Sequence, residues 1–330
     1  MTDLERTTAA LLTRCSFPPA GTEVTCGVSG GADSLALLVL AVEAGCTVTA
    51  VHVDHGSRPG STEEATVVAD AAARFGATFR GERVAVAPGP NFEARARRAR
   101  YGVLPPDVLT GHTADDQAET VLLNLLRGAG LDGLAAMRRG SRRPILSLRR
   151  SETESLCRSL GLDPVVDPTN ADPSFRRNRV RHEVLPLLDD VAARDVVPLL
   201  TRLADHAREA SDHLVDEAAR LDVCDARMLT AAPPAVARVA VREWLRTCSE
   251  DRHPPDAATV DRVLRVAGNA SAATDVGGGW RVGRSAGRLR LERTAGPVPQ
   301  PSAAPSGSAA CAEDGRTAEN GPVVAPEREA

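Results

Sequence analysis

The chain has 330 residues, a formal net charge of −4 and 42% hydrophobic residues. That length predicts two domains, and the apolar content is sufficient for buried cores. We expect a cytoplasmic protein, because the start of the chain does not resemble a signal peptide and no run approaches the length of a membrane span. The seven cysteines are far apart and odd in number, which indicates reduced thiols and argues against a C-x-x-C site.

The first predicted unit is a strand, a glycine-rich turn and a helix. Residues 23–28 favour a strand, residues 35–44 are apolar, and Gly45 is suited to ending a helix in the left-handed conformation. The turn between them is Ser29-Gly30-Gly31-Ala32-Asp33-Ser34. Unpaired amides at a helix start favour an anionic oxygen, so a phosphate-binding loop is predicted, with an ordinary βα turn as the alternative. It is not a Walker loop, because the chain contains no Lys.

Strands and helices continue to alternate up to about residue 162. We expect strands at 47–53, 78–84, 107–111 and 145–148, and helices at 61–76, 91–101 and 115–127. Capping boxes are predicted at Ser61/Glu64 and at Ser151/Glu154. Repeated units of this size predict the α/β class, with a doubly wound, mainly parallel sheet that binds ligands at the carboxyl ends of its strands.

Two polar groups follow predicted strands. In the first, His52 and Asp54 share one side of a strand, and we favour nucleotide contact over a metal site because no third ligand has suitable spacing. In the second, GHTADDQAET at 111–120, Asp115 and Glu119 lie four residues apart and share a helical face. Such carboxylates can hold Mg²⁺ bridged to phosphate or a substrate ammonium group, whereas the plainer alternative is an acid-capped helix.

Arginine is concentrated between residues 138 and 181. Eleven arginines face five acids there, which gives a local charge of +6 in a chain that is negative overall. Phosphate contact is one interpretation and a solvated basic face is the other. The end of this stretch, FRRNRVRHEVLP at 175–186, predicts an amphipathic helix with guanidinium groups suited to phosphate.

The pattern changes at about residue 190. Helices without strands follow, interrupted at Pro233-Pro234 and Pro254-Pro255, and then a hairpin is predicted from 280–282 and 289–291. Beyond residue 293 the chain is rich in Pro, Ala, Ser, Gly and acids, which predicts disorder. We therefore expect a catalytic domain at 1–189, a smaller, mostly helical C-terminal domain at 190–293 and a disordered tail at 294–330.

The hexapeptide at 29–34 resembles the SGGxDS signature of PP-loop ATP pyrophosphatases. Five further strings occur in the same order as in the tRNA(Ile)-lysidine synthetase family. Together with the hexapeptide, they make the chain resemble that family from Val24 to about Leu188. These strings are HVDHGSR at 52–58, FEARARRARY at 92–101, GHTADDQAET at 111–120, RGAGLDGLAAM at 127–137 and NADPSFRRNRVRHEVLP at 170–186. The resemblance implies a PP-loop domain followed by a helical domain that grips tRNA, in a short form of the family.

The resemblance also implies a reaction and its ligands. These are ATP, Mg²⁺, free L-lysine and an isoleucine tRNA with the anticodon CAU; the sequence leaves a homodimer open. ATP would adenylate the C2 carbonyl oxygen of cytidine 34, and the ε-amine of lysine would then displace AMP to give lysidine. The main alternative is a PP-loop tRNA thiolase, which needs positioned cysteines or a cluster. A nucleotide-sensing RNA-binding module without turnover is a further alternative, against which the carboxylates argue.

Roles for individual residues follow from the resemblance. Asp33 would be the Mg²⁺-associated carboxylate, while Asp115, Asp116 and Glu119 would steer the lysine ammonium and accept a proton. The residues expected to contact ATP are Ser29, Gly30, Gly31, Ala32, Asp33, Ser34, Asp54, His112, Asn178 and Arg181. Arg179 would bind phosphate or stabilise charge during adenylation, as would its neighbours Asn178 and Arg181.

Overall fold

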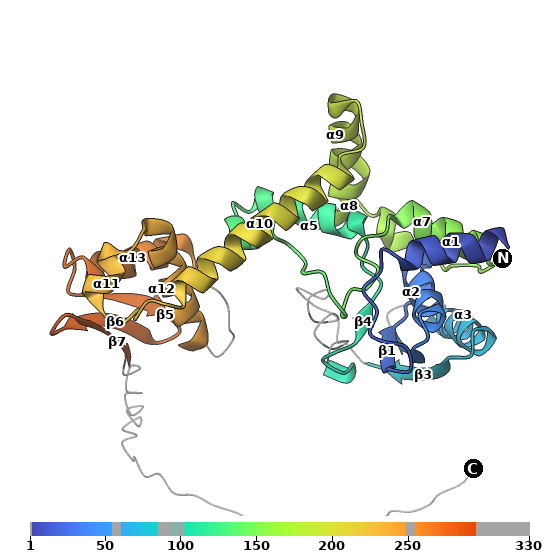
Figure 1. Cartoon of the computed structure of the whole chain (residues 1–330), viewed down its shortest axis with the longest axis horizontal. Helices are drawn as coiled ribbons and strands as arrows, with labels where there is room; N and C mark the ends of the chain where they lie inside the picture. Colours follow the sequence, from blue (N-terminus) through green and yellow to red (C-terminus); the bar gives the residue numbers. More distant parts are fainter. Residues whose placement is uncertain are drawn as a thin grey trace, which may run out of the picture.

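The computed structural model describes residues 2–54, 61–84, 95, 99, 102–248 and 255–294. Two lobes are joined by one long helix, α10 (Val197–Ala218) (Figure 1). Within the described residues, no helix is long and apolar enough to cross a membrane.

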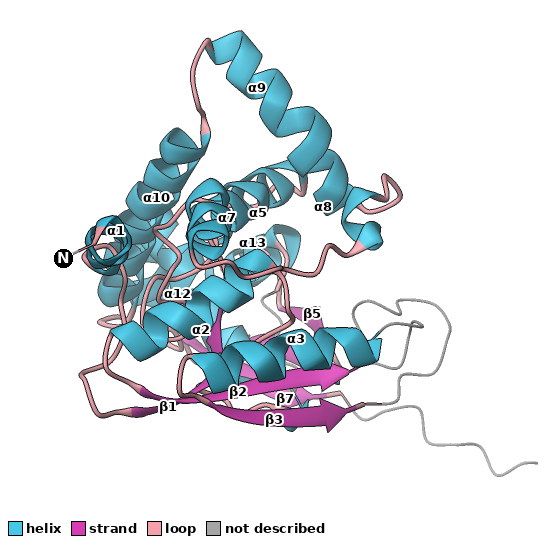
Figure 2. Ribbon diagram, turned by 90° about the vertical axis from the view of Figure 1, so that its right-hand side faces the viewer, coloured by secondary structure: helices cyan, strands magenta, loops and turns pink. Residues whose placement is uncertain are grey.

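The first lobe is built on a four-stranded parallel sheet of order β3-β2-β1-β4. The strands are β1 (Glu23–Gly27), β2 (Thr47–Asp54), β3 (Thr78–Arg83) and β4 (Leu109–Thr110). Helices α2 (Ala32–Glu43) and α3 (Ser61–Arg74) cover the same face of it (Figure 2). Residues 34–41 of α2 are all buried, because α1 (Asp3–Leu12) and α7 (Arg150–Ser159) pack against its other side. The predicted parallel α/β fold is confirmed.

The strand order determines where a ligand can bind. The chain runs from β1 outward through β2 to β3 and then returns to place β4 on the other side of β1. Such a reversal creates a crevice at the carboxyl ends of the two adjoining strands, where α/β proteins bind ligands. The predicted phosphate loop follows β1, and the acidic motif at 111–120 follows β4. The topology therefore brings both motifs to one crevice.

Two local predictions in this lobe are wrong, and a third lies mostly outside the described residues. Residues 145–148 form a turn, because their apolar side chains mark burial without strand pairing: Ile145 and Leu148 are fully buried. Helix α7 begins at Arg150 and is capped by Glu152, whose carboxylate accepts a hydrogen bond from the Arg149 N–H at 2.8 Å, so the predicted Ser151/Glu154 box is not used. The predicted helix at 91–101 lies mostly outside the described residues.

Further helical segments follow β4 in the chain. They are α5 (Ala114–Leu126), α6 (Leu131–Leu134), a 3-10 turn (Pro168–Ala171), α8 (Arg176–Arg179), a π-helical turn (Val180–Val184) and α9 (Leu185–Ala192). The last three are continuous, and the π-helical turn occurs where Pro186 cannot donate a backbone hydrogen bond to residue 182. A small core joins Ala118 and Leu122 of α5 to Val180, Val196 and Val197.

The second lobe has its own core beneath a small antiparallel sheet. Its helices are α11 (Ala226–Ala231), α12 (Pro234–Cys248) and α13 (Ala257–Ala267), and its strands are β5 (Ala273–Gly277), β6 (Trp280–Ser285) and β7 (Arg288–Arg293). The predicted hairpin is confirmed as β6 and β7. Strand β5 was not predicted, because its sequence ATDVG lacks a continuous β-prone run. The domain boundaries stay predictions, and the tail beyond residue 294 lies outside the described residues.

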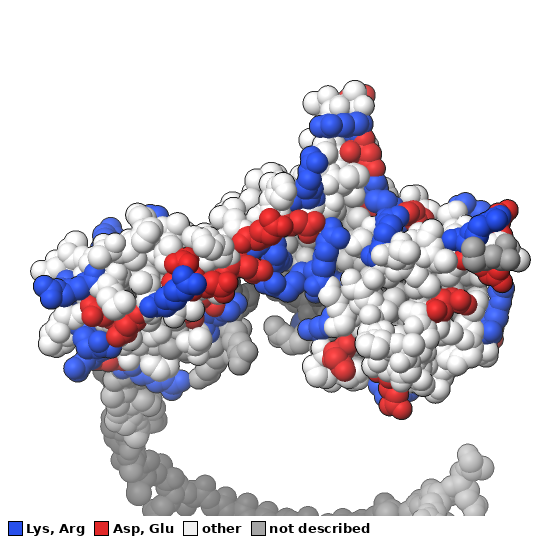
Figure 3. All heavy atoms as spheres, in the orientation of Figure 1, with Lys and Arg blue, Asp and Glu red and all other residues white. Residues whose placement is uncertain are grey.

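Part of the basic stretch holds the first lobe against α10. The Arg138 and Arg139 guanidinium groups pair with Asp212 and Asp205 on α10, with N···O distances of 2.7 and 2.9 Å. Figure 3 shows acidic and basic side chains adjoining between the lobes. The local charge of +6 is therefore partly neutralised by acids distant in sequence, and these two arginines form ion pairs rather than a free phosphate-binding surface.

Candidate active site

The glycine-rich loop after β1 has the geometry of an anion cradle. Gly30 has φ of +85°, a conformation that favours glycine, and Gly31 is the N-cap of α2. The Ser34 hydroxyl donates to the Gly31 carbonyl at 2.8 Å and accepts from the Ser29 N–H at 3.1 Å, which fixes the turn. Within the described residues no side chain caps this helix start, so its first amides are available to a ligand.

The loop after β4 touches the phosphate loop directly. A Cβ atom added to Gly111 would lie 2.7 Å from the Asp33 carbonyl oxygen and 3.1 Å from the Ser34 Cα atom. Only a residue without a side chain fits between these backbones, so Gly111 brings the acidic motif against the start of α2.

Gly111→Ala should therefore displace the two loops and destabilise the protein by about 1–3 kcal/mol, as overpacking does. ATP binding should weaken as well. Isothermal titration calorimetry would measure the affinity for ATP, and urea unfolding would measure the stability. Gly102→Ala is the matched control, because a Cβ atom there meets nothing within 4 Å. Equal behaviour of the two variants would show that the close approach is not needed.

Three carboxylates and three guanidinium groups form one partly buried network beside this loop. We call it the carboxylate–arginine cluster, and its members are Asp33, Asp116, Glu119, Arg150, Arg177 and Arg181. They come from α2, α5, α7, α8 and the π-helical turn. The charges balance within the cluster, which allows ionised groups to be buried together.

Glu119 is the most enclosed member of the carboxylate–arginine cluster, with a side chain that is 0% exposed. Its carboxylate accepts from the Nε atoms of Arg177 and Arg181, both at 2.7 Å, and from Nη1 of Arg150 at 3.3 Å. Arg177 and Arg181 are four residues apart, so one helical face presents both to Glu119. The side chain is therefore held by guanidinium groups from two directions.

Asp116 joins the same guanidinium groups to the start of α5. Its carboxylate accepts from Nη2 of Arg177 at 2.9 Å, from Nη2 of Arg150 at 3.1 Å and from the Thr113 N–H at 2.8 Å. Burial alone would raise the pKa of Asp116, but the charges of Arg150 and Arg177 outweigh it and lower the pKa. Asp116 is therefore an anion in the ligand-free protein.

Asp33 is the member that belongs to the phosphate loop. Its carboxylate is 3.3 Å from Nε of Arg150 and accepts a hydrogen bond from the Thr153 hydroxyl. Burial raises the pKa of Asp33 to about 6, although Thr153 and Arg150 both act to lower it. A metal ion or another cation near Asp33 would relieve this cost of burial.

The raised pKa of Asp33 predicts a specific pH dependence of stability. Between the ordinary value of 3.8 and about 6, the folded protein holds a proton that the unfolded chain has lost. The free energy of unfolding of the wild type, relative to Asp33→Asn, should therefore fall as pH rises through this window and stay constant above it. Urea unfolding of both proteins from pH 4 to pH 8 measures this difference, and a difference that increases with pH would contradict the prediction.

Asp115 lies beside the carboxylate–arginine cluster in a separate ion pair. Its carboxylate accepts from Nε and Nη2 of Arg149, both at 3.1 Å, and from the Arg150 N–H at 2.8 Å. Burial opposes the charged form, but these hydrogen bonds lower the pKa of Asp115. Arg149 also pairs with Asp195, so two carboxylates share one guanidinium group and leave a local negative charge.

Other predicted site residues have different surroundings. The exposed Arg179 guanidinium pairs with Glu183 at 2.8 Å and does not join the carboxylate–arginine cluster, because its position on the helix is opposite to that of Arg177 and Arg181. Asn178 donates to the carbonyl oxygens of Thr169 and Asp172 at 2.8 and 2.9 Å, which ties the preceding loop to α8.

Two more of the predicted nucleotide contacts, His112 and Asp54, lie at or just beyond strand ends. His112 Nδ1 lies 2.8 Å from the Thr110 hydroxyl, beyond β4. Asp54 is the last residue of β2, and its carboxylate is 3.7 Å from Nε of Arg83. Their contact with a nucleotide stays a prediction.

In the sequence, Arg149, Arg150 and Arg177 stand out only as part of a basic stretch. The structure places all three against the acidic motif. The four-residue spacing of Arg177 and Arg181 was a usable signal, since it predicts one cationic face opposite one set of acids. Arg149 and Arg150 gave no comparable signal, because their contacts depend on how α7 packs beside α5.

Comparison with known proteins agrees with this geometry. A profile of the PP-loop domain matches residues 2–188, and a profile of the TilS substrate binding domain matches residues 225–290. A tRNA(Ile)-lysidine synthase of Nocardia farcinica is 42% identical over 306 residues, which cover 84% of this chain and 94% of the relative. One of Rhodococcus erythropolis is 44% identical over 238 residues, covering 67% of this chain and 73% of the relative.

A solved structure shares the fold of the chain at low sequence identity. The U34-tRNA thiolase NcsA from Methanococcus maripaludis, with its [4Fe-4S] cluster, superposes with a TM-score of 0.51 at 17% identity, covering 62% of this chain and 80% of that chain. Identity this low supports the fold alone. The two profiles and the relatives at 42–44% identity go further, and they show that the chain belongs to the tRNA(Ile)-lysidine synthase family of PP-loop proteins.

Proposed function

We propose that this chain ligates free L-lysine to C2 of cytidine 34 in the CAU anticodon of an isoleucine tRNA, consuming ATP and producing lysidine, AMP and pyrophosphate. One observation carries the proposal: the carboxylate–arginine cluster assembles at the crevice between β1 and β4, against the phosphate loop. The relatives and the TilS substrate binding domain profile support the identity of the substrates.

ATP is the substrate that suits the phosphate loop and the nearby guanidinium groups. The uncapped start of α2 offers backbone N–H groups, and Arg150, Arg177 and Arg181 supply positive charge within the same crevice. In our proposal the phosphates draw these arginines from the carboxylates they contact in the ligand-free protein. The arginines would then stabilise the charge that develops on departing pyrophosphate.

Mg²⁺ fits this site as an ion shared with the substrate. Within the described residues, no three His, Cys, Asp or Glu side chains gather to hold a metal by themselves. Asp33 would therefore bind it together with phosphate oxygens, in keeping with how Mg²⁺ is held in nucleotide sites. The ion would neutralise phosphate charge.

Adenylation forms a bond between the α-phosphorus of ATP and the C2 carbonyl oxygen of the base, and it breaks the bond to pyrophosphate. The lysine ε-amine then attacks C2, and AMP leaves with the oxygen. We assign Asp115, Asp116 and Glu119 to holding the ammonium group and accepting a proton from it. Asp115 is the best placed before ATP binds, because it and Asp195 share one arginine.

The proposal is tested by following labelled lysine into tRNA. The chain, ATP, Mg²⁺ and ¹⁴C-lysine should label a transcript of the isoleucine tRNA, with one AMP formed per lysine, while a methionine tRNA that shares the anticodon stays unlabelled. Lack of label in the cognate transcript would contradict the proposal. Light scattering on the same preparation tests the homodimer that the sequence left open.

The thiolase alternative is disfavoured by the surroundings of the thiols. Burial raises the pKa of Cys26 to about 12 and that of Cys157 to about 11, and buried thiols of this kind are poor nucleophiles. Cys15, Cys26, Cys46 and Cys157 form no disulfide, and within the described residues no group of side chains is suited to a metal or cluster. Thiolation of the same transcript with a sulfide donor, without use of lysine, would reverse this judgement.

A further inference from the structure

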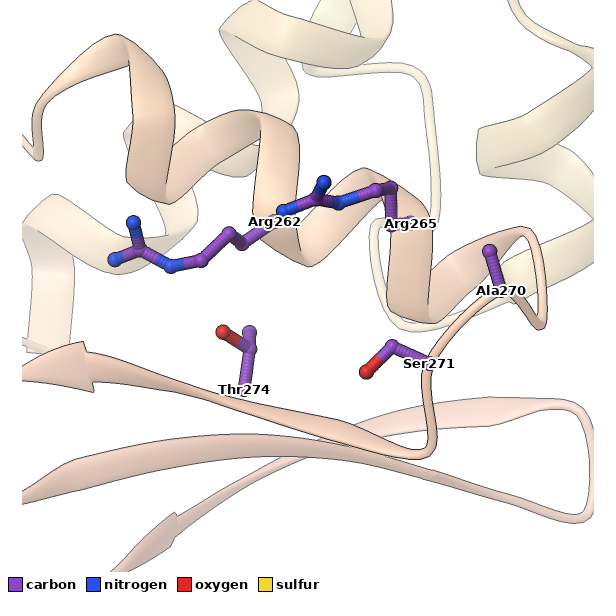
Figure 4. A pocket seen from close by; sticks show the side chains of 5 residues that line it. All are labelled: Arg262, Arg265, Ala270, Ser271 and Thr274. Carbon is purple, nitrogen blue, oxygen red and sulfur yellow. The ribbon is translucent and has the colours of Figure 1, made fainter.

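The second lobe contains a small polar cavity that the reaction at the carboxylate–arginine cluster does not use. It has a volume of about 190 Å³ and lies between α13 and the edge strand β5. Its lining residues are Arg262, Arg265, Ala270, Ser271 and Thr274. Figure 4 shows the two guanidinium groups extending from α13 above the gap, with the hydroxyl groups of Ser271 and Thr274 on the opposite side. Such a set of donors suits an anion with several oxygen atoms.

The charge on the two arginines is not taken up by acids. Arg262 donates to the Thr259 hydroxyl at 2.8 Å and to the Asp275 carbonyl oxygen at 3.5 Å, and within the described residues neither Arg262 nor Arg265 forms an ion pair. The pKa of Asp256 is lowered mainly by hydrogen bonds from Thr259, and Arg262 adds only a smaller electrostatic contribution.

Several other arginines of this lobe do pair with acids. The pairs are Arg220 with Glu217, Arg238 with Asp261, Arg246 with Glu243 and Arg288 with Asp222. These pairs do not involve Arg262 or Arg265, whose positive charges stay at the wall of the cavity.

The position of the cavity limits which substrate can reach it. Helix α10 has 22 residues and is about 33 Å long; it packs against α5 and α6 of the first lobe and against α12 of the second, so it keeps the phosphate loop and the cavity far apart. ATP and lysine are far too short to extend over that distance. A tRNA bound with its anticodon at the crevice is long enough, and its backbone carries a phosphodiester at every nucleotide.

We propose that Arg262, Arg265, Ser271 and Thr274 form a binding site for a backbone phosphate of the tRNA, remote from the anticodon. This inference rests on the proposed function for its choice of substrate. Arginine suits the role, because its planar group can donate two hydrogen bonds to one phosphate. A contact to the backbone positions the tRNA without reading its sequence.

The test is tRNA binding by fluorescence anisotropy over a series of salt concentrations. The double variant Arg262→Gln/Arg265→Gln should bind the full-length tRNA at least roughly tenfold more weakly. The log–log dependence on salt should become shallower by about 0.7–0.9 for one lost phosphate contact. Arg262→Lys/Arg265→Lys keeps the charge but loses the two-pronged geometry. Its affinity for tRNA should therefore lie between those of the wild type and the Gln double variant. Each variant must melt at the wild-type temperature.

Two comparisons locate the contact. Arg238→Gln removes one positive charge from an exposed ion pair in this lobe and should bind tRNA like the wild type. A stem–loop fragment containing only the anticodon arm should bind the wild type and the double variant equally. An unchanged salt dependence in the double variant, or an equal loss of affinity for the fragment, would overturn the proposal.

The outcome is separable from that of the proposed function, because the binding assay contains neither ATP nor lysine. In the reaction itself, the double variant should raise the KM for tRNA and leave kcat unchanged. Failure of the wild type to incorporate lysine would refute the proposed function and leave the anisotropy result intact.

Discussion

Asp33→Asn should reduce the rate of pyrophosphate release on the order of 10³-fold, because an amide cannot replace a carboxylate beside a metal-bound phosphate. The fold should survive, since burial raises the pKa of Asp33 to about 6 and the charged carboxylate is therefore costly to bury. Removing its charge at neutral pH relieves a desolvation cost and leaves Arg150 paired with Asp116 and Glu119. Pyrophosphate release with saturating tRNA and lysine, alongside thermal unfolding, measures both effects.

The control for this variant is Asp70→Asn, which neutralises an exposed aspartate on α3 and should leave turnover unchanged. Titration with Mg²⁺ adds a second check. If Asp33→Asn turned over at the wild-type rate at limiting Mg²⁺, Asp33 would not be a metal ligand.

Glu119→Gln should have the second largest effect, and it should act on both stability and lysine. The fully buried carboxylate contacts three guanidinium groups, and the neutral amide would leave their charge uncompensated. Breaking a buried pair from one side costs about 3–5 kcal/mol, so urea unfolding should show a loss of this size. Any protein that remains folded should bind lysine more weakly, by about 1.5–3 kcal/mol per lost charged hydrogen bond, with less change for ATP.

Two further variants separate these effects. Glu183→Gln breaks the exposed pair with Arg179 and should leave the stability nearly unchanged, because solvent screens this pair. Asp115→Asn leaves the carboxylate–arginine cluster intact and should weaken lysine binding without the large loss of stability. If Asp115→Asn and Glu119→Gln both weakened ATP and not lysine, the carboxylates would belong to the nucleotide or metal site instead.

Local sequence signals predicted the parts of the fold that local physics determines. The strand, turn and helix around residues 23–44 follow from a β-prone run, two glycines and a continuous apolar stretch, and the structure confirms them. Gly45 ends the helix with φ of +82°, as its position predicted. The apolar run at 145–148 was misleading, because burial in a turn and burial in a strand produce the same pattern.

The site was less accessible from the sequence because ion pairing crosses elements. Asp115, Asp116 and Glu119 were identified as a functional set, but nothing local showed that Arg150 would contact the last two from another helix. Arg179 was chosen as a catalytic candidate from its motif, although helical geometry turns it away from Arg177 and Arg181. The four-residue spacing in that motif favours Arg177 and Arg181, which share one helical face, over Arg179.

The proposed reaction is tested most directly by measuring pyrophosphate release with each substrate left out in turn. Adenylation of the base followed by lysine attack predicts sustained release only when ATP, the cognate isoleucine tRNA and lysine are all present, with one lysine joined to tRNA for each pyrophosphate. Asp33→Asn should be inactive in the complete mixture. Sustained release without lysine, or lysine-dependent release without tRNA, would contradict the claim that the carboxylate–arginine cluster joins lysine to an adenylated cytidine.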